Sequence, residues 1–286
     1  MSLREIKQRI GSVKTTQKIT SAMKLVSSAK LHRAQSAVEG VRPYQRKLDS
    51  IFSAFISGLS GGNAYTEKRG LGRVAIVAVA SNSTMCGAFN SNIIKLMRSV
   101  ADEYTTRGIA VELYVVGKKM AEAAKKMGTV TDDSLIAQAG SPRYTAVADT
   151  AYSLMERFRA KELDRIELVY TSYVSASRQQ PVRELFLPFV AGTSQNGPAS
   201  MPVDYIVEPG IPQVLKALLP KVIALRLYTA LLDSATAEHA ARMIAMQVAT
   251  ENATDLISEL TLEYNKGRQQ AITSELQDIL SGSIGE

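Results

Sequence analysis

The sequence has no tryptophan, one cysteine and two histidines among its 286 residues. A single cysteine, Cys86, excludes a disulfide within the chain and is typical of a reducing compartment. His32 and His239 lie in opposite terminal segments without a set of cysteine or carboxylate companions, so we expect no metal site. Aromatic residues make up only 6% of the chain, which favours long helices over a thick globular core.

Long hydrophobic runs are also missing. No apolar run approaches the ~18–20 residues that a membrane-spanning helix needs. The first residues have neither the apolar core of a signal peptide nor the Arg/Ser-rich, acid-poor composition of a transit peptide, because Glu5 and a helix-capping signal come at once. We therefore expect neither a membrane span nor a targeting peptide.

Phosphate-binding and catalytic motifs are not found either. Neither G-x-G-x-x-G nor G-x-x-x-x-G-K-[ST] follows the strand-like run at 74–80. The nearest feature is Cys86-Gly-Ala in the next loop, where one glycine is typical of a turn. Cys86 has no local base, which indicates a small, partly buried side chain rather than a nucleophile. We expect no catalytic residue and no cofactor.

Proline is absent from Lys221 to Glu286, which predicts a helix far longer than the usual 11–12 residues or so, beginning near Gln213. Apolar or small residues recur there at the 3-4 spacing of a coiled-coil seam: Val222, Leu225, Leu232, Met243, Met246, Ala253, Ile257, Leu260 and Tyr264. The same seam carries Thr229, Thr236, His239 and Thr250, which reduce its burial. Pro220 is expected to bend the helix near its base.

A second long helix is predicted at the N-terminus. Ser2 and Glu5 form a capping box. The first apolar stripe is Leu3, Ile6, Ile10 and Val13. After Gln17 we expect it to resume one position out of register, on Ile19, Ala22, Val26 and Ala29. Pro43 should kink or interrupt this helix, and Gly61-Gly62-Asn63 should end it.

The middle of the chain alternates strand and helix patterns, which favours a small α/β domain with a mostly parallel sheet. Predicted strands cover 74–80, 111–116, 166–174 and 182–187, the last two possibly a hairpin, and predicted helices cover 91–106, 118–127 and 145–160. We divide the chain into an N-terminal coiled-coil helix (1–60), an α/β insert (73–192), a Gly/Pro/Ser-rich connection (193–212) and a C-terminal coiled-coil helix (213–286).

Charge differs between the two terminal segments. Residues 1–50 hold 11 basic and 3 acidic side chains, whereas residues 225–286 hold 4 basic and 9 acidic ones. Opposite charge favours pairing of the two helices. The basic segment also fits a solvated face, a nucleic-acid footprint or docking on an acidic protein surface; no recognised nucleic-acid module surrounds it.

Three stretches resemble the gamma-subunit family of bacterial F-type ATP synthases. Residues 264–282 are similar to its C-terminal signature, Ile-Thr-x-Glu followed by an acid and a glycine, here Ile272, Thr273, Glu275, Asp278 and Gly282. Thr16-Gln-Lys-Ile-Thr-x-Ala-Met and Ala240-Ala-Arg-Met-x-Ala-Met match two further motifs, and Asp204-Tyr-x-x-Glu-Pro is similar to a family turn. Asn82-Ser-Thr departs from the family's Asp-Lys/Arg-Gly.

The resemblance implies an antiparallel coiled coil of the terminal helices with an inserted Rossmann-like α/β domain. It implies a central-stalk rotor that turns inside three alpha and three beta subunits and couples transmembrane proton flow to ATP synthesis and hydrolysis at the beta sites. The implied partners also include the epsilon subunit and the ring of c subunits, with membrane contact only through that ring and no nucleic acid. The implied location is peripheral, on the cytoplasmic face of the bacterial inner membrane.

Site residues follow from the matched motifs. The resemblance implies that beta-subunit loops contact Met23, Lys24, Arg242, Arg268, Gln269, Thr273 and Glu275. It places Tyr205 and Glu208 at a foot near the epsilon subunit and the c ring. An exposed polar helix face is the alternative for the Arg268–Thr273 group, and plain coiled-coil packing is the alternative for Met23.

Two other classes remain open from the residues alone. An α/β enzyme with a helical oligomerisation arm predicts that the isolated chain binds a nucleotide or substrate. A coiled-coil nucleic-acid binder predicts a salt-steep affinity for DNA.

Overall fold

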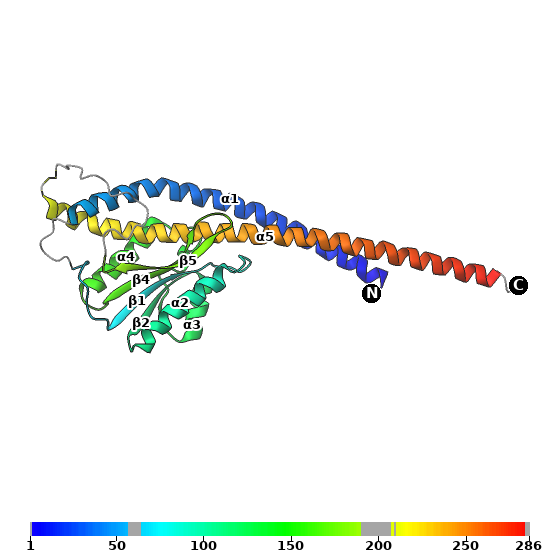
Figure 1. The fold of residues 1–286 in the computed structure, drawn as a ribbon, viewed down its shortest axis with the longest axis horizontal. Helices are drawn as coiled ribbons and strands as arrows, with labels where there is room; N and C mark the ends of the chain where they lie inside the picture. Colours follow the sequence, from blue (N-terminus) through cyan, green and yellow to red (C-terminus); the bar gives the residue numbers. More distant parts are fainter. Residues whose placement is uncertain (1, 57–63, 190–206, 209, 284–286) are drawn as a thin grey trace. The chain divides into compact units, whose positions relative to one another are not determined.

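The computed structural model describes residues 2–56, 64–189, 207–208 and 210–283. Two long helices, α1 (Leu3–Ile56) and α5 (Ile211–Ser283), lie at the two ends of the sequence (Figure 1). Residue contacts divide the chain into two compact units. We call residues 29–241 the body, and residues 1–28 with 242–286 the arm.

A five-stranded sheet forms the centre of the body, in the order β3-β2-β1-β4-β5. Its strands are β1 (Arg73–Val79), β2 (Ala110–Val116), β3 (Val130–Asp132), β4 (Arg165–Tyr173) and β5 (Gln179–Leu187). Strands β1 to β4 are parallel, and β5 runs antiparallel to β4. The connecting helices are α2 (Phe89–Thr106), α3 (Lys118–Met127), the 3-10 turn η1 (Ile136–Gln138) and α4 (Tyr144–Arg159).

Helices cover both faces of the sheet, because the central strand β1 is apolar on both sides (Figure 1). Val74, Ile76 and Ala78 pack with α2 and α3. Ala75, Val77 and Val79 alternate with them and pack with α4 and with the body segments of α1 and α5. The continuous apolar run at residues 74–80 is therefore explained by the burial of β1 between two helical layers.

The predicted elements of the body are present, including the exact bounds of α3 and a hairpin of β4 and β5. Strand β3 was not predicted, because three residues give no periodic signal. Pro43 and Pro220 each lie inside a continuous helix, so neither proline ends its helix. The glycines proposed to end α1 and most of the 193–212 connection lie outside the described residues.

In the arm, the two helices pair antiparallel. Gln17 Nε2 donates to Thr254 Oγ1 at 2.8 Å, and the hydroxyl oxygens of Thr20 and Thr250 lie 2.8 Å apart. Near the start of α1, a Cβ on Gly267 would lie 3.0 Å from the Leu3 side chain. The numbers of each facing pair add to about the same value, as an antiparallel register requires. Ser2 and Glu5 form the predicted capping box.

The predicted change of register on α1 is wrong. Thr20 is only 9% exposed and Ser27 only 2%, so the buried seam continues in strict 3-4 register through hydroxyl residues. Ile19 and Val26, assigned to the seam from their apolar character, are 55% and 56% exposed. The hydroxyls are tolerated because each donates within its own helix, Thr20 to the Gln17 carbonyl and Ser27 to the Met23 carbonyl.

The α5 seam follows the prediction. Val222, Leu225, Met246, Ala253 and Leu260 are buried, and the remaining predicted positions are buried or half-buried. The predicted fold class is thereby confirmed: two long terminal helices, antiparallel where they pair, enclose an α/β insert in the sequence. Nowhere in the described residues does a helix combine the length and hydropathy needed to cross a membrane.

Candidate partner-binding surface

An apolar stripe runs along α1 on a side of the helix away from its seam. At about 100° per residue, the stripe of Ile19, Ala22, Val26 and Ala29 is centred roughly 130° from Thr20 and Ser27. All four stripe residues are exposed, and the neighbouring Leu25 is 66% exposed. Exposed apolar side chains arranged along one helix face indicate contact with another protein. Between Ile19 and Ser27, α1 thus turns hydroxyls inward and apolar groups outward.

Met23 and Lys24 lie on either side of the α1 seam. Both are half-buried, and Lys24 lies on the seam side of the helix. Arg242 on α5 is also half-buried. Extending the register of the Thr20–Thr250 pair places Arg242 across from residue 28, about one helical turn from Lys24. The structure therefore brings these three predicted residues to one level of the arm.

The other predicted arm residues lie along α5 beyond its contact with Leu3. Arg268, Gln269, Thr273 and Glu275 are exposed, and Thr273 Oγ1 donates to the Gln269 carbonyl. They project from an arc of about 160° of the helix circumference. This tip is 26 residues from Arg242 in one helix, which corresponds to about 40 Å. The arm residues thus form two separate clusters.

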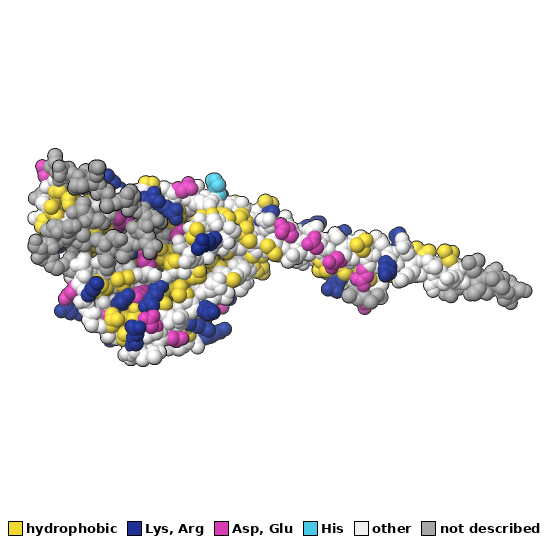
Figure 2. All heavy atoms as spheres, in the orientation of Figure 1, with side chains coloured by type: hydrophobic (Ala, Val, Ile, Leu, Met, Phe, Trp, Pro, Cys, Tyr) yellow, Lys and Arg dark blue, Asp and Glu magenta, His cyan; other side chains and the backbone are white. Residues whose placement is uncertain are grey.

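Two further residues of the tip were missed from the sequence. Ile272 is 48% exposed and Leu276 is 55% exposed, and both project from the same arc as Arg268 and Thr273. Figure 2 shows apolar side chains on α5 beyond the paired part of the arm. The sequence does contain a signal for them, because Ile272 and Leu276 form an apolar pair at i and i+4 beyond Tyr264, the last predicted seam residue. A polar rim around apolar groups is the usual composition of a protein interface.

The opposite charges of the two arm helices do not pair directly. Between residues 2–28 and 243–277, no ion pair joins α1 to α5. Glu251, Asp255, Glu259 and Glu263 are all exposed at i, i+4 spacing and form an acidic row along α5 (Figure 2). Electrostatic attraction between the basic α1 and the acidic α5 therefore acts without direct ion pairs in this part of the arm, and salt screens it.

The predicted foot residues are placed only in part. Tyr205 lies outside the described residues. Glu208 is exposed and precedes the first residue of α5, Ile211. Its role stays a prediction.

The loop after β1 has a structural role. Asn82 Oδ1 accepts from the Lys118 backbone N–H at the start of α3, and Asn82 Nδ2 donates to the Ala139 carbonyl. Cys86 is 1% exposed and receives a hydrogen bond from Asn90 Nδ2 at 3.2 Å. Asn82, which departs from the family pattern, therefore connects three loops at the ends of the strands, where an α/β enzyme would hold its ligand.

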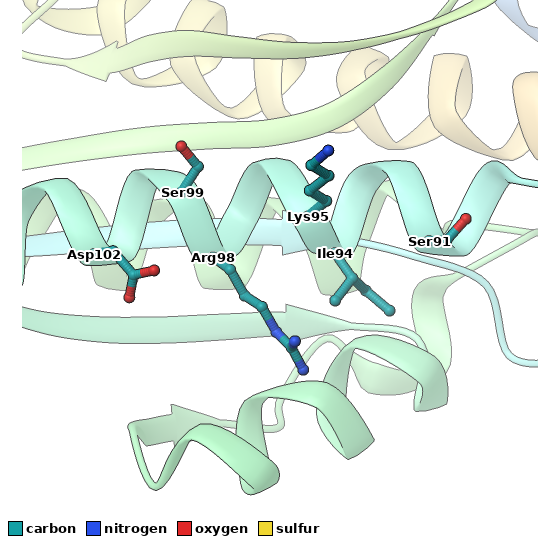
Figure 3. Close-up of a pocket in the computed structure, with 6 residues that line it drawn as sticks. All are labelled: Ser91, Ile94, Lys95, Arg98, Ser99 and Asp102. Atoms are coloured by element: carbon teal, nitrogen blue, oxygen red, sulfur yellow. The ribbon is translucent and has the colours of Figure 1, made fainter.

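A shallow hollow on the surface of α2 does not have the form of an active site. Its lining residues all come from the outer face of α2: Ser91, Ile94, Lys95, Arg98, Ser99 and Asp102 (Figure 3). Side chains of one helix cannot converge on a ligand from several directions as binding pockets require. This hollow does not support the enzyme alternative.

The two histidines do not meet. His239 Nε2 lies 3.2 Å from the Gly140 carbonyl oxygen and Nδ1 lies 2.8 Å from Glu238 Oε2, whereas His32 is exposed. Among the described residues, no group of three or more His, Cys, Asp or Glu side chains has the arrangement of a metal site.

Fold and surface together define a class of protein: two long terminal helices with an α/β insert between them in the sequence, and exposed apolar side chains on the helices that can contact other proteins. Comparison with known proteins identifies the particular family. A family model described as ATP synthase matches residues 2–284. The chain is 48% identical to the ATP synthase gamma chain of Bacteroides fragilis, 47% to that of Phocaeicola vulgatus and 42% to that of Flavobacterium psychrophilum. Each alignment covers at least 98% of both chains. The chain belongs to the family of ATP synthase gamma chains.

Solved structures agree on the fold. A chain of the Euglena gracilis mitochondrial ATP synthase, in the OSCP/F1/c-ring structure of rotational state 3, superposes with a TM-score of 0.64. It is 20% identical, and the match covers 99% of this chain and 94% of that one. A chain from the central stalk and c ring of the Tetrahymena thermophila enzyme gives a TM-score of 0.55 at 20% identity, covering 81% of this chain and 99% of that one.

Proposed function

We propose that this chain is the central-stalk rotor subunit of a bacterial F-type ATP synthase. It turns inside a ring of three alpha and three beta subunits and couples transmembrane proton flow to ATP synthesis and hydrolysis at the beta sites. It carries no catalytic site of its own. It lies peripherally on the cytoplasmic face of the inner membrane, and touches the membrane only through the c ring.

The observation that carries this proposal is the inverted polarity of α1 in the arm. A stable coiled coil would bury Ile19 and Val26 and expose Thr20 and Ser27, but the reverse holds. The pair gives up apolar burial between its helices, which keeps it narrow, and offers apolar groups to a surrounding partner. An axle within a sleeve of other subunits needs both properties.

The residue roles belong to the same proposal. Arg268, Gln269, Thr273 and Glu275, with Ile272 and Leu276, contact beta-subunit loops at the tip of the arm. Met23, Lys24 and Arg242 contact beta lower down. Tyr205 and Glu208 form the foot toward epsilon and the c ring. In this scheme residues 1–60 and 213–286 are the axle, 193–212 connect, and 73–192 are the insert.

Coupling follows from contacts that differ among the three beta subunits. A rotor with different faces touches each beta subunit differently in any one orientation, so it stabilises a different conformation in each. Nucleotide affinity then changes with rotor angle.

Co-expression with the alpha and beta subunits of the same organism tests the proposal. We expect an ATP-hydrolysing complex that contains this chain and in which a probe on the body rotates during hydrolysis. Failure to isolate such a complex, or hydrolysis without rotation, would contradict it.

A further inference from the structure

Asp233 of α5 connects the sheet to both long helices in the body. It is 8% exposed. Its Oδ2 accepts hydrogen bonds from Ser172 Oγ at 2.9 Å and from the Tyr173 backbone N–H at 3.2 Å, both at the end of β4. Its Oδ1 accepts from the Arg42 guanidinium of α1 at 3.4 Å. One carboxylate of α5 thus accepts three hydrogen bonds from two other elements, β4 and α1.

Arg226 makes a second connection between α5 and the sheet. Its Nε donates to Glu184 Oε1 of β5 at 2.8 Å, and the same carboxylate accepts from the Tyr170 hydroxyl of β4 at 2.9 Å. The Arg226 guanidinium also lies over the Phe189 ring, 5.4 Å from its centroid. Phe189 in turn meets Phe52 of α1 edge-on.

The two connections share one face of α5. Arg226 and Asp233 are seven residues apart, so they lie two turns, about 10 Å, apart on the same side of the helix. On the sheet, Tyr170 and Ser172 are two residues apart on β4 and point to the same face. The contacts of Arg226 and Asp233 therefore attach the same face of α5 to the sheet at two places.

Apolar packing around these two connections restrains the position of α5 on the sheet with less directionality than hydrogen bonds do. The surrounding core contacts of α5 with the sheet are apolar, and hydrophobic burial is non-directional. Hydrogen-bonded ion pairs are directional, and separating one inside a protein leaves an uncompensated charge. These polar contacts therefore add a directional restraint on sliding or rotation of α5 to the restraint that the close-packed core side chains already impose.

We propose that Arg42, Tyr170, Ser172, Glu184, Arg226 and Asp233 form a polar joint that transmits torque between the α/β body sheet and the axle helices. This inference rests on the proposed rotor function. The six are positioning residues: they contact neither nucleotide nor the alpha and beta subunits, and they hold the sheet and α5 in one register under load.

The test uses the assembled ATP synthase in inverted membrane vesicles. E184L/D233L removes both connections, and E184Q/D233N keeps the side-chain shapes, removes the charges and replaces one acceptor oxygen of each carboxylate with an NH2 group. We expect E184L/D233L to hydrolyse ATP while pumping fewer protons per ATP than wild type, and E184Q/D233N to show a smaller loss. If E184L/D233L does not assemble, the loss in E184Q/D233N decides in the same way.

Glu167 of β4 supplies a matched control. It is 1% exposed and binds Tyr104, Arg165 and Arg183, all within the insert. E167L should lower thermal stability at least as much as E184L/D233L and leave proton pumping per ATP unchanged. Equal coupling loss in E167L, or unchanged coupling in the joint variants, would overturn the inference. Absence of the wild-type chain from the hydrolysing complex would instead overturn the rotor function itself.

Discussion

The arm and the body bury different chemistry although the same two helices run through both. In the body, large apolar side chains such as Ile76, Phe158 and Phe186 are fully buried. In the arm, Ile6, Met246 and Leu260 are buried as well, but the α1 seam at Thr20 and Ser27 consists of hydroxyl residues, and the apolar Ile19 and Val26 beside it are exposed. The body is thus stabilised by its own core, whereas the arm keeps apolar surface for a partner.

The largest effect is expected from truncating the body core. Phe158 is fully buried, and the Arg69 guanidinium lies 4.8 Å from its ring centroid. Phe158→Ala should lower the free energy of unfolding by about 3–5 kcal/mol, because it leaves a cavity in a close-packed core. Chemical unfolding of the purified chain measures this. A loss below about 1 kcal/mol would show that the body core does not carry the stability, contrary to this comparison.

The second largest difference between body and arm is expected from alanine substitutions at two glycines. Gly117 has φ +89°, and a Cβ there would lie 2.2 Å from the Ala80 carbonyl oxygen. Gly117→Ala should therefore cost about 3 kcal/mol through strain and backbone displacement. Gly267→Ala in the arm meets only the Leu3 side chain, so it should change stability by less than about 1 kcal/mol, with the helix-propensity gain offsetting the shift of Leu3. Similar losses at both sites would contradict the distinction.

The polar seam can be tested with a double-mutant cycle. Thr20→Val or Thr250→Val alone removes one side of the 2.8 Å hydroxyl contact and should cost about 1 kcal/mol. Replacing both with valine should recover most of that loss, because each single variant places a methyl group against the remaining hydroxyl, whereas the double variant places two methyl groups against each other. Thermal unfolding of the four proteins gives the coupling. Strictly additive losses would mean that the two hydroxyls do not interact.

Acid should change the body's stability through Asp233. Burial raises the pKa of the Asp233 carboxyl above its ordinary value, although hydrogen bonds from Ser172 and Tyr173 oppose the shift. The folded state therefore takes up a proton at a pH where the unfolded state does not. The Asp233 contribution to stability should rise as pH falls through the raised pKa, and level off below the ordinary pKa.

Unfolding of wild type and Asp233→Asn from pH 7 to pH 4 measures this small effect. The stability difference between the two proteins should shift in favour of wild type as pH falls. Asp149→Asn, at an exposed position on α4, is the control and should show no such trend. A pH-independent difference for Asp233→Asn would contradict the assignment.

The sequence was sufficient for elements whose burial leaves a periodic pattern. Strand β1 showed as an apolar run, α3 as a short helix between glycines, and the α5 seam as a 3-4 repeat. The α1 seam was misplaced after Gln17 because the apolar pattern assumes that apolar residues face the partner helix, and in the arm they face away. The contacts of Asp233 could not be foreseen either, since they join α5 to residues about 60 and 190 positions earlier. The residues assigned to beta, epsilon and the c ring stay predictions.

The most direct test of the account concerns the outward stripe of α1. Ile19→Ser with Val26→Ser should leave the unfolding free energy of the purified chain within about 0.5 kcal/mol of wild type, because both side chains are exposed. The same double variant should bind the alpha/beta ring more weakly in a competition assay against labelled wild type. Thr15→Ala with Ser12→Ala, exposed positions of the same helix, is the control. The predicted result is weaker competition at unchanged stability. Unchanged competition by the stripe variant would contradict the claim that the apolar stripe of α1 contacts the alpha/beta ring.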